Sequence, residues 1–157
     1  MESFKEVVDL FKKFNIERMF DKIMRQLSDE IIQLNQIEQL SEGIDANDTR
    51  IITKTAEFQR TGKPYSFQAI NERRARGLQV DNVDLNFTGK FWKTFRVKKV
   101  KDGWSVEAKF NLYGEDIRAN FDSSYDFTGL TQNNTEVLVY NSVMPMLEKE
   151  IKLYFGI

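Results

Sequence analysis

The sequence predicts an α+β domain with long N-terminal and C-terminal helices packed on a small antiparallel sheet. Two observations favour this class: apolar residues repeat at helical spacing near both ends, and the middle of the chain alternates around an Asp-Gly pair. The chain has 157 residues, of which 41% are hydrophobic and 30% are charged. This size and composition are typical of one globular domain, so we expect residues 1–157 to form a single domain.

Two helices are predicted before residue 44. The first is a short helix within residues 1–15, because Ser3 stands in the N-cap position and Glu6 follows in the capping-box position. The second is a long helix from about Ile16 to Glu42, whose apolar residues follow one another at spacings of three and four. Gly43 is expected to end this helix in the left-handed conformation.

Residues 44–65 are predicted to form an extended arm. Arg50-Ile51-Ile52 is rich in β-branched residues, and Thr61-Gly62-Lys63-Pro64 interrupts regular structure. A loop this long inside a compact domain usually has a function, and we expect Ile51 and Ile52 to reach a neighbouring subunit.

A short basic helix is predicted after the arm. Ser66 can cap a helix that runs through Arg76, with Arg73, Arg74 and Arg76 in polar positions. Polar and apolar residues alternate over residues 80–87 and predict a short strand. A one-turn helix is expected to follow, with Thr88 as its cap and Gly89 as a turn residue.

The clearest local signal is a β-hairpin over residues 94–110. Asp102-Gly103 separates two alternating segments, and such a pair is typical of a two-residue hairpin turn. With Asp102 and Gly103 as the turn, Phe95 faces Phe110, Val97 faces Ala108, and Lys98 lies opposite Glu107.

The last predicted element is a long C-terminal helix with a narrow apolar seam. Its seam residues repeat at spacings of 3, 4, 3, 4 and 3: Val137, Tyr140, Met144, Leu147, Ile151 and Tyr154. Pro145 lies inside the helix, where it removes a backbone hydrogen bond and is expected to cause a bend.

Charge is distributed unevenly along the chain, although the net charge is only −1. Residues 1–59 hold 8 basic and 12 acidic residues, residues 60–109 hold 12 and 5, and residues 110–157 hold 3 and 7. An acidic–basic–acidic pattern can dock copies of a chain by complementary potential. The alternative is a nucleic-acid-binding or regulatory protein that uses the basic segment 73–101.

Most catalytic chemistry has no candidate residues here. The chain contains no histidine and no cysteine, and it lacks both a phosphate-binding loop and a dinucleotide fingerprint. We therefore predict no catalytic residue, no metal site, no cofactor and no enzymatic activity. A carboxylate site is the one enzymatic alternative that the sequence leaves open. No stretch is apolar enough to span a bilayer, so no membrane partner is expected.

Hairpin residues are the remaining candidates for a contact surface. Trp104 stands beside the turn, where an aromatic side chain often anchors a partner. Lys98, Lys99 and Lys101 are expected to face solvent and to prevent uncontrolled pairing of the sheet edge. Phe91, Trp92 and Phe95 alternate with basic residues like a base-stacking platform, but we favour a core position for them.

The order of several segments resembles a known family. They are Leu34-Asn35-Gln36 to Glu42-Gly43-Ile44-Asp45, the run from Val83 to Val97, Asp102-Gly103-Trp104-Ser105-Val106, and Gly129-Leu130-Thr131. Together they resemble the small neck proteins of tailed bacteriophages, the tail-completion or head–tail connector proteins. The likeness covers roughly residues 31–155 and is greatest to members from Bacteroidetes phages, including the crAss-like group. Family members usually carry a glycine shortly after the Gly-Ile-Asp turn, where this chain has Ala46-Asn47-Asp48.

The resemblance implies a structural role in the virion. Identical subunits would form a neck ring that joins the portal-bound capsid to the tail, assembled in the cytoplasm of the bacterial host. Its partners would be further copies, the neighbouring portal, adaptor or tail proteins, and the genomic DNA that passes through the channel. On this basis, reversing the charges of Arg73, Arg74 and Arg76 is expected to block assembly without unfolding the subunit.

Overall fold

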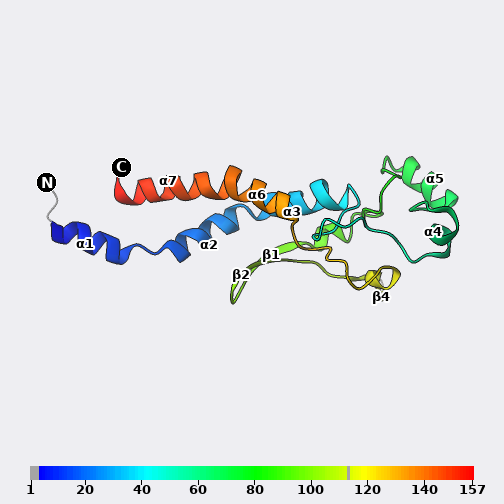
Figure 1. The fold of residues 1–157 in the computed structure, drawn as a ribbon, viewed down its shortest axis with the longest axis horizontal. Coiled ribbons are helices and arrows are strands. Elements are labelled where there is room, and N and C mark those ends of the chain that lie inside the picture. The colour runs from blue at the N-terminus through cyan, green and yellow to red at the C-terminus, as the bar shows by residue number, and fades with distance from the viewer. Residues whose placement is uncertain (1–3, 113) are drawn as a thin grey trace.

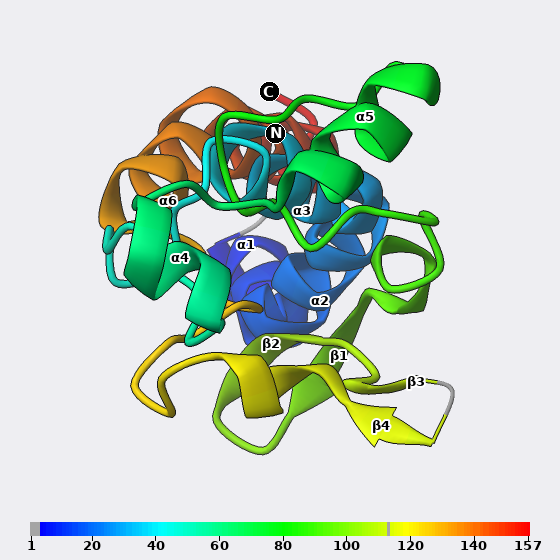
Figure 2. The same ribbon diagram turned by 90° about the vertical axis from the view of Figure 1, so that its right-hand side faces the viewer.

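The computed structural model describes residues 4–112 and 114–157, which form an elongated molecule (Figure 1). Two helical runs lie side by side in opposite directions, so that α1 and the end of α7 lie at one end of the molecule. The opposite end carries two short helices, and the strands lie along one side (Figure 2). The mixed helix-and-sheet class predicted from the sequence is confirmed.

The N-terminal run is made of four helical segments rather than two. They are α1 (Phe4–Lys13), α2 (Ile16–Gln26), α3 (Ser28–Asn35) and the π-helix η1 (Gln36–Leu40). The single helix predicted from Ile16 to Glu42 is wrong in this respect, because Leu27 interrupts it and its last turn widens. No glycine or proline marks either place, so the sequence gives no local sign of them. The predicted cap Ser3 lies outside the described residues.

The C-terminal run contains α6 (Gln132–Leu138), the π-helix η4 (Val139–Val143) and α7 (Met144–Phe155). Pro145 stands in the first turn of α7, directly after the π-helix. Because proline has no backbone N–H, the preceding turn loses one helical hydrogen bond. A bend was predicted at Pro145; what the structure has there is a π-helical turn directly before α7.

The predicted arm is folded against its own subunit. Ile44 and Arg50 form an isolated antiparallel bridge, and the N–H of Ile51 donates to the carbonyl of Gly43 at 2.7 Å. Part of the arm is helical, in contrast to the predicted extended chain: α4 (Ala56–Thr61) begins after the capping hydroxyl of Thr55. Helix α5 (Phe67–Ala75) follows, with the Ser66 hydroxyl accepting from the N–H of Ala69.

A β-hairpin occupies the predicted place, but its register differs. Strands β1 (Arg96–Val100) and β2 (Gly103–Glu107) pair so that Val97 faces Val106 and Val100 faces Gly103. The turn residues are therefore Lys101 and Asp102, and the predicted Asp102-Gly103 turn is wrong. A shift of two residues keeps each side chain on the same face, so the alternating pattern could not distinguish the two registers.

The conformation of Gly103 accounts for the position of the β1–β2 turn, which lies one residue earlier than predicted. Gly103 has φ 147°, whereas neither Lys101 nor Asp102 has a positive φ. The glycine therefore takes the unusual backbone conformation as the first residue of β2 instead of inside the turn. The predicted Lys98–Glu107 pair still forms at 3.6 Å, as a diagonal contact between exposed side chains.

The remaining strands are very short. β3 (Asn111–Leu112) pairs with β4 (Glu115–Asp116), and the 3₁₀-helix η3 (Ile117–Asn120) follows. Residues 80–87, all of which are described, form an irregular loop, so the strand predicted there is wrong. This loop leads to the 3₁₀-helix η2 (Trp92–Thr94).

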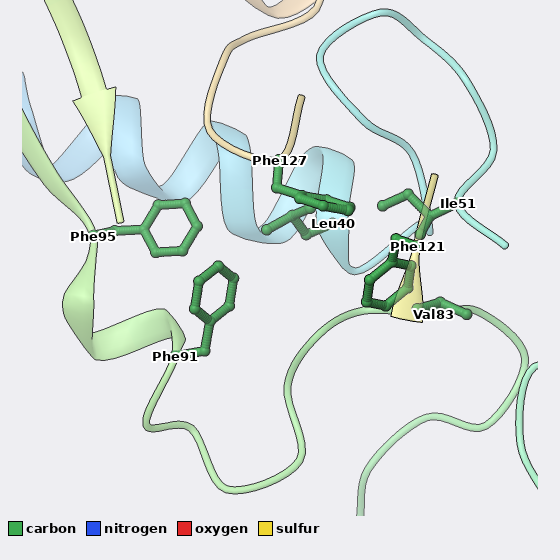
Figure 3. Packing of buried hydrophobic residues seen from close by; sticks show 7 residues of the cluster. All are labelled: Leu40, Ile51, Val83, Phe91, Phe95, Phe121 and Phe127. Carbon is green, nitrogen blue, oxygen red and sulfur yellow. The ribbon is translucent and has the colours of Figure 1, made fainter. Parts of the chain in front are cut away.

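An aromatic core joins the loops to the end of the N-terminal run. Figure 3 shows its buried side chains converging from segments far apart in the sequence: Leu40, Ile51, Val83, Phe91, Phe95, Phe121 and Phe127. The rings of Phe91 and Phe95 meet edge to face at 5.1 Å between centroids. Such pairs stabilise by roughly 0.5–1.5 kcal/mol beyond the burial of their area.

A second core lies between the two helical runs. Its buried side chains come from α2, the α2–α3 junction, α3, α6 and η4: Ile23, Met24, Leu27, Ile31, Leu138 and Val143. Val97, Trp104 and Val106 of the hairpin pack against it. The hairpin therefore contacts this helical core as well as the aromatic core.

Buried polar side chains connect distant segments. Asp45 is almost fully buried, and its carboxylate accepts from the backbone N–H groups of Asn47, Thr49 and Asp126 at 2.9–3.0 Å. Gln39 links η1 to residues 129–134 by accepting from the N–H of Thr131 at 2.8 Å and donating to the carbonyl of Gly129 at 3.0 Å. These contacts hold the turn after η1 against the segment that leads into α6.

Candidate functional site

Helix α5 is attached to the molecule by a buried ion pair. The Arg73 guanidinium donates from Nη2 to Oδ2 of Asp84 at 2.5 Å, and both side chains are 4% exposed or less. Arg73 also donates from Nε to the carbonyl of Gln79 at 2.7 Å. No other residue of α5 is buried. The orientation of this helix is therefore fixed mainly by hydrogen bonds and charge.

Tyr65 completes the buried network around this pair. Its hydroxyl lies 2.8 Å from the carbonyl of Asn82 and 3.2 Å from Oδ1 of Asp84, and the Arg73 guanidinium stacks 4.3 Å from its ring centroid. Burial, and after it the negative charge of Asp84, raises the pKa of the Tyr65 hydroxyl. Tyr65 therefore stays protonated and available as a hydrogen-bond donor.

A groove of about 590 Å³ opens beside this network, between the arm, α5 and residues 83–88. Leu85 lines it and has φ 55°, a left-handed conformation that is rare for a bulky side chain. The conformation is held by Asp84, whose carbonyl accepts from the Trp92 indole at 2.9 Å and whose carboxylate accepts from the N–H of Asn86.

The predicted contact residues fall into two groups. Arg73 is 2% exposed and Ile51 is equally buried, so their prediction as surface contacts is wrong. The reason is that Arg73 pairs with Asp84 inside the subunit, while Ile51 fills the aromatic core. Arg74, Arg76 and Ile52 are exposed. Reversal of all three arginine charges would therefore disrupt the fold as well as the surface, contrary to the expectation from the sequence.

Hairpin lysines are partly engaged within the subunit. Lys98 pairs with Glu107, and Lys99 pairs with Asp21 of α2. The hydrogen bond from Lys99 lowers the pKa of the Asp21 carboxyl. Lys101 is exposed at the turn, whereas Trp104 is half-buried with the Arg25 guanidinium 5.9 Å from its ring centroid. Trp104 therefore presents only part of its side chain to a partner.

The predicted cap and turn residues shape the backbone. Gly43 has φ 72° directly after the N-terminal run, and a Cβ there would lie 2.9 Å from Cβ of Asn82. The Thr88 hydroxyl accepts from the N–H of Lys90 at 3.4 Å, and Gly89 has φ 71° before η2. Asp102 and Gly103 lie at the hairpin turn as described above.

An unexpected exposed surface lies on the outer side of the C-terminal run. We name its seam residues the α6–α7 row: Val137, Tyr140, Met144, Leu147, Ile151 and Tyr154. Tyr140 is 69% exposed and Met144 is 53% exposed, while Leu147 and Ile151 are partly covered. A shallow groove of about 530 Å³ follows this row along α7. The seam was recognisable from the sequence, but its outward orientation was not.

The comparisons with known proteins identified no relative of this chain. Comparison of the chain with protein-family models, with curated proteins and with solved structures finds no match. The resemblance to phage neck proteins therefore stays a prediction. In the described part of the chain, no helix is both long and apolar enough to cross a membrane, and no cluster of three or more acidic side chains could hold a metal ion.

Proposed function

We propose that this protein is a structural subunit that works as a homo-oligomer. The assembly that fits its sequence resemblance is a neck ring of a tailed bacteriophage, joining the portal and capsid to the tail. Further copies, together with portal, adaptor or tail proteins, would be its partners. DNA would pass through the ring without being held by a specific site.

The observation that carries this proposal is the exposed α6–α7 row. Spacings of three and four are typical of helices that pack against another helix. Here the inner side of the same run already packs on α2 and α3, through Leu138 and Val143. Leu147 of the row also packs against this inner core. The exposed members of the row, chiefly Tyr140 and Met144, form a second apolar patch, and covering it with another subunit would remove its apolar surface from water.

The nucleic-acid alternative has less support. A DNA-binding surface requires cations that are free to approach phosphates. Within the basic segment 73–101, Arg73 is buried, Lys98 and Lys99 form ion pairs, and Arg96 donates to backbone carbonyls. Ion pairs within the subunit therefore compensate part of this segment's positive charge, while Arg74 and Arg76 stay exposed.

Paired substitutions in the row test the proposal. Tyr140→Glu with Met144→Glu should abolish oligomers seen by analytical ultracentrifugation, because two charges would have to be buried at the contact. The free energy of unfolding of the subunit should change by less than about 0.5 kcal/mol, since both side chains are surface residues. A matched control, Gln132→Glu with Asn133→Glu, adds the same charge at two other exposed positions of α6. Oligomers that survive the row variant and the control alike would contradict the proposed interface.

A further inference from the structure

We infer that the subunits contact one another through α5 of one copy and the acidic end of the N-terminal run of the next copy, where Ile37 and Glu38 of η1 and Glu42 after it are exposed. This inference rests on the proposed function, because it names the charged contact that would accompany self-assembly. The two surfaces differ in composition and lie on different elements of the same subunit. A contact between them is heterologous, the type that closes into rings.

Helix α5 presents an outer face whose side chains are exposed. Phe67, Asn71 and Arg74 follow at spacings of four and three, so they share one side of the helix. Phe67 is 79% exposed, among the highest values for a large apolar side chain here. Arg74 forms no ion pair with a described side chain, and Arg76 follows with its guanidinium 4.5 Å from the ring centroid of Phe87.

The attachment of α5 gives this face a fixed orientation. No α5 residue belongs to either buried apolar cluster. Instead, the buried Arg73–Asp84 pair and the Gln79 carbonyl hold one side of the helix. Phe67 and Arg74 are exposed on this helix, and Figure 2 shows α5 projecting from the edge of the molecule. A rigid surface loses little conformational freedom on binding.

The complementary surface is acidic. From Gln26 to Thr49 the sequence contains six acidic residues and no lysine or arginine. Asp45 of these six is buried and fully engaged, whereas Asp29, Glu38 and Glu42 are exposed and form no ion pair with a described side chain. Ile37 precedes Glu38 in η1 and is 52% exposed.

The two faces therefore match in charge and in apolar character. Each has one prominent apolar side chain, Phe67 on α5 and Ile37 on η1, flanked by charges of opposite sign. An apolar centre with a charged rim is the usual composition of a protein interface. Complementary rim charges also fix register and exclude wrong pairings.

Charge exchange tests the inference directly. Arg74→Glu with Arg76→Glu should weaken assembly roughly hundredfold, because each attractive contact becomes repulsive. Glu38→Arg with Glu42→Arg should weaken it similarly. The variant that carries all four substitutions restores opposite charges between the four exchanged positions, so its assembly should recover. Oligomer fractions would be measured by mass photometry across a concentration series.

Two further variants separate a specific contact from general effects. Lys109→Glu with Lys149→Glu makes the same change of net charge at exposed positions elsewhere, and it should assemble normally. Phe67→Ser should weaken assembly while the urea midpoint stays unchanged, because the side chain is already in water. Either variant behaving otherwise would overturn the inference.

The outcomes also separate this inference from the proposed function. If the natural chain assembles but the charge-reversal pairs assemble equally well, or the fourfold variant is not restored, only the α5 contact is wrong. If the natural chain stays monomeric with and without virion proteins, the proposed function is wrong and the contact falls with it. Salt-sensitive DNA binding that Arg74→Glu and Arg76→Glu abolish would assign the α5 face to nucleic acid instead.

Discussion

Single residues decide how the loop-rich end of this molecule is held. Arg73 and Asp84 are ordinary surface residue types, yet both are buried and joined at 2.5 Å. A buried ion pair contributes little when it is intact but leaves a costly unpaired charge when one partner is removed. The sequence showed only a cluster of three arginines, and nothing in it distinguished the buried one from its neighbours.

Arg73→Ala should destabilise the subunit by about 3–5 kcal/mol, because Asp84 would be left charged and buried. Urea unfolding of the purified variant measures this loss. Arg74→Ala, one residue later and exposed, is the matched control and should lie within about 0.5 kcal/mol of the natural chain. Equal stabilities for the two variants would contradict the buried network.

Asp48 occupies a position suited to glycine. It is exposed, and its φ of 58° is left-handed. Asp48→Gly should be more stable than Asp48→Ala by about 1–2 kcal/mol, because only alanine has a Cβ that resists this conformation. Thermal unfolding of both variants would test this, and the reverse order would disprove the left-handed turn.

At the scale of elements, the mixed helix-and-sheet class was predicted from the sequence, but the finer relationships were not. Each predicted long helix is divided into shorter segments, and the hairpin turn is not at Asp102-Gly103. The hairpin register was missed because a shift of two residues leaves the alternating pattern unchanged. The predicted strand at 80–87 failed because Asp84 uses its side chain and carbonyl to hold an irregular loop. Tertiary contacts of this kind have no local sequence signature.

The segment before α6 depends on close packing at Gly129. A Cβ added there would lie 2.7 Å from both Cβ of Ala46 and Oδ2 of Asp126. Gly129→Ala should therefore destabilise the subunit by roughly 1–3 kcal/mol, the usual cost of overpacking. Adding Ala46→Gly removes one of the two clashes and should recover part of the loss in urea unfolding. No recovery would show that Asp126 alone sets the limit.

For the whole molecule, the unpartnered surfaces are the main finding. An elongated subunit exposes Tyr140 and Met144 of the α6–α7 row on one helical run, and Phe67 on α5. The apolar seam and the uneven charge were visible in the sequence. Which seam residues are buried could be assigned only from the structure, because it shows which side of the C-terminal run packs on α2 and α3. Exposed apolar rows on small subunits are typical of proteins that function in assemblies.

The most direct test of the central claim is the mass distribution of the purified natural chain, alone and with a candidate portal or neck protein. Negative-stain microscopy of the same samples would show the shape of any complex. We expect closed rings of uniform subunit number, formed by the chain itself or on addition of the partner. A single-subunit mass at every concentration, unchanged by every virion protein tested, would contradict the account.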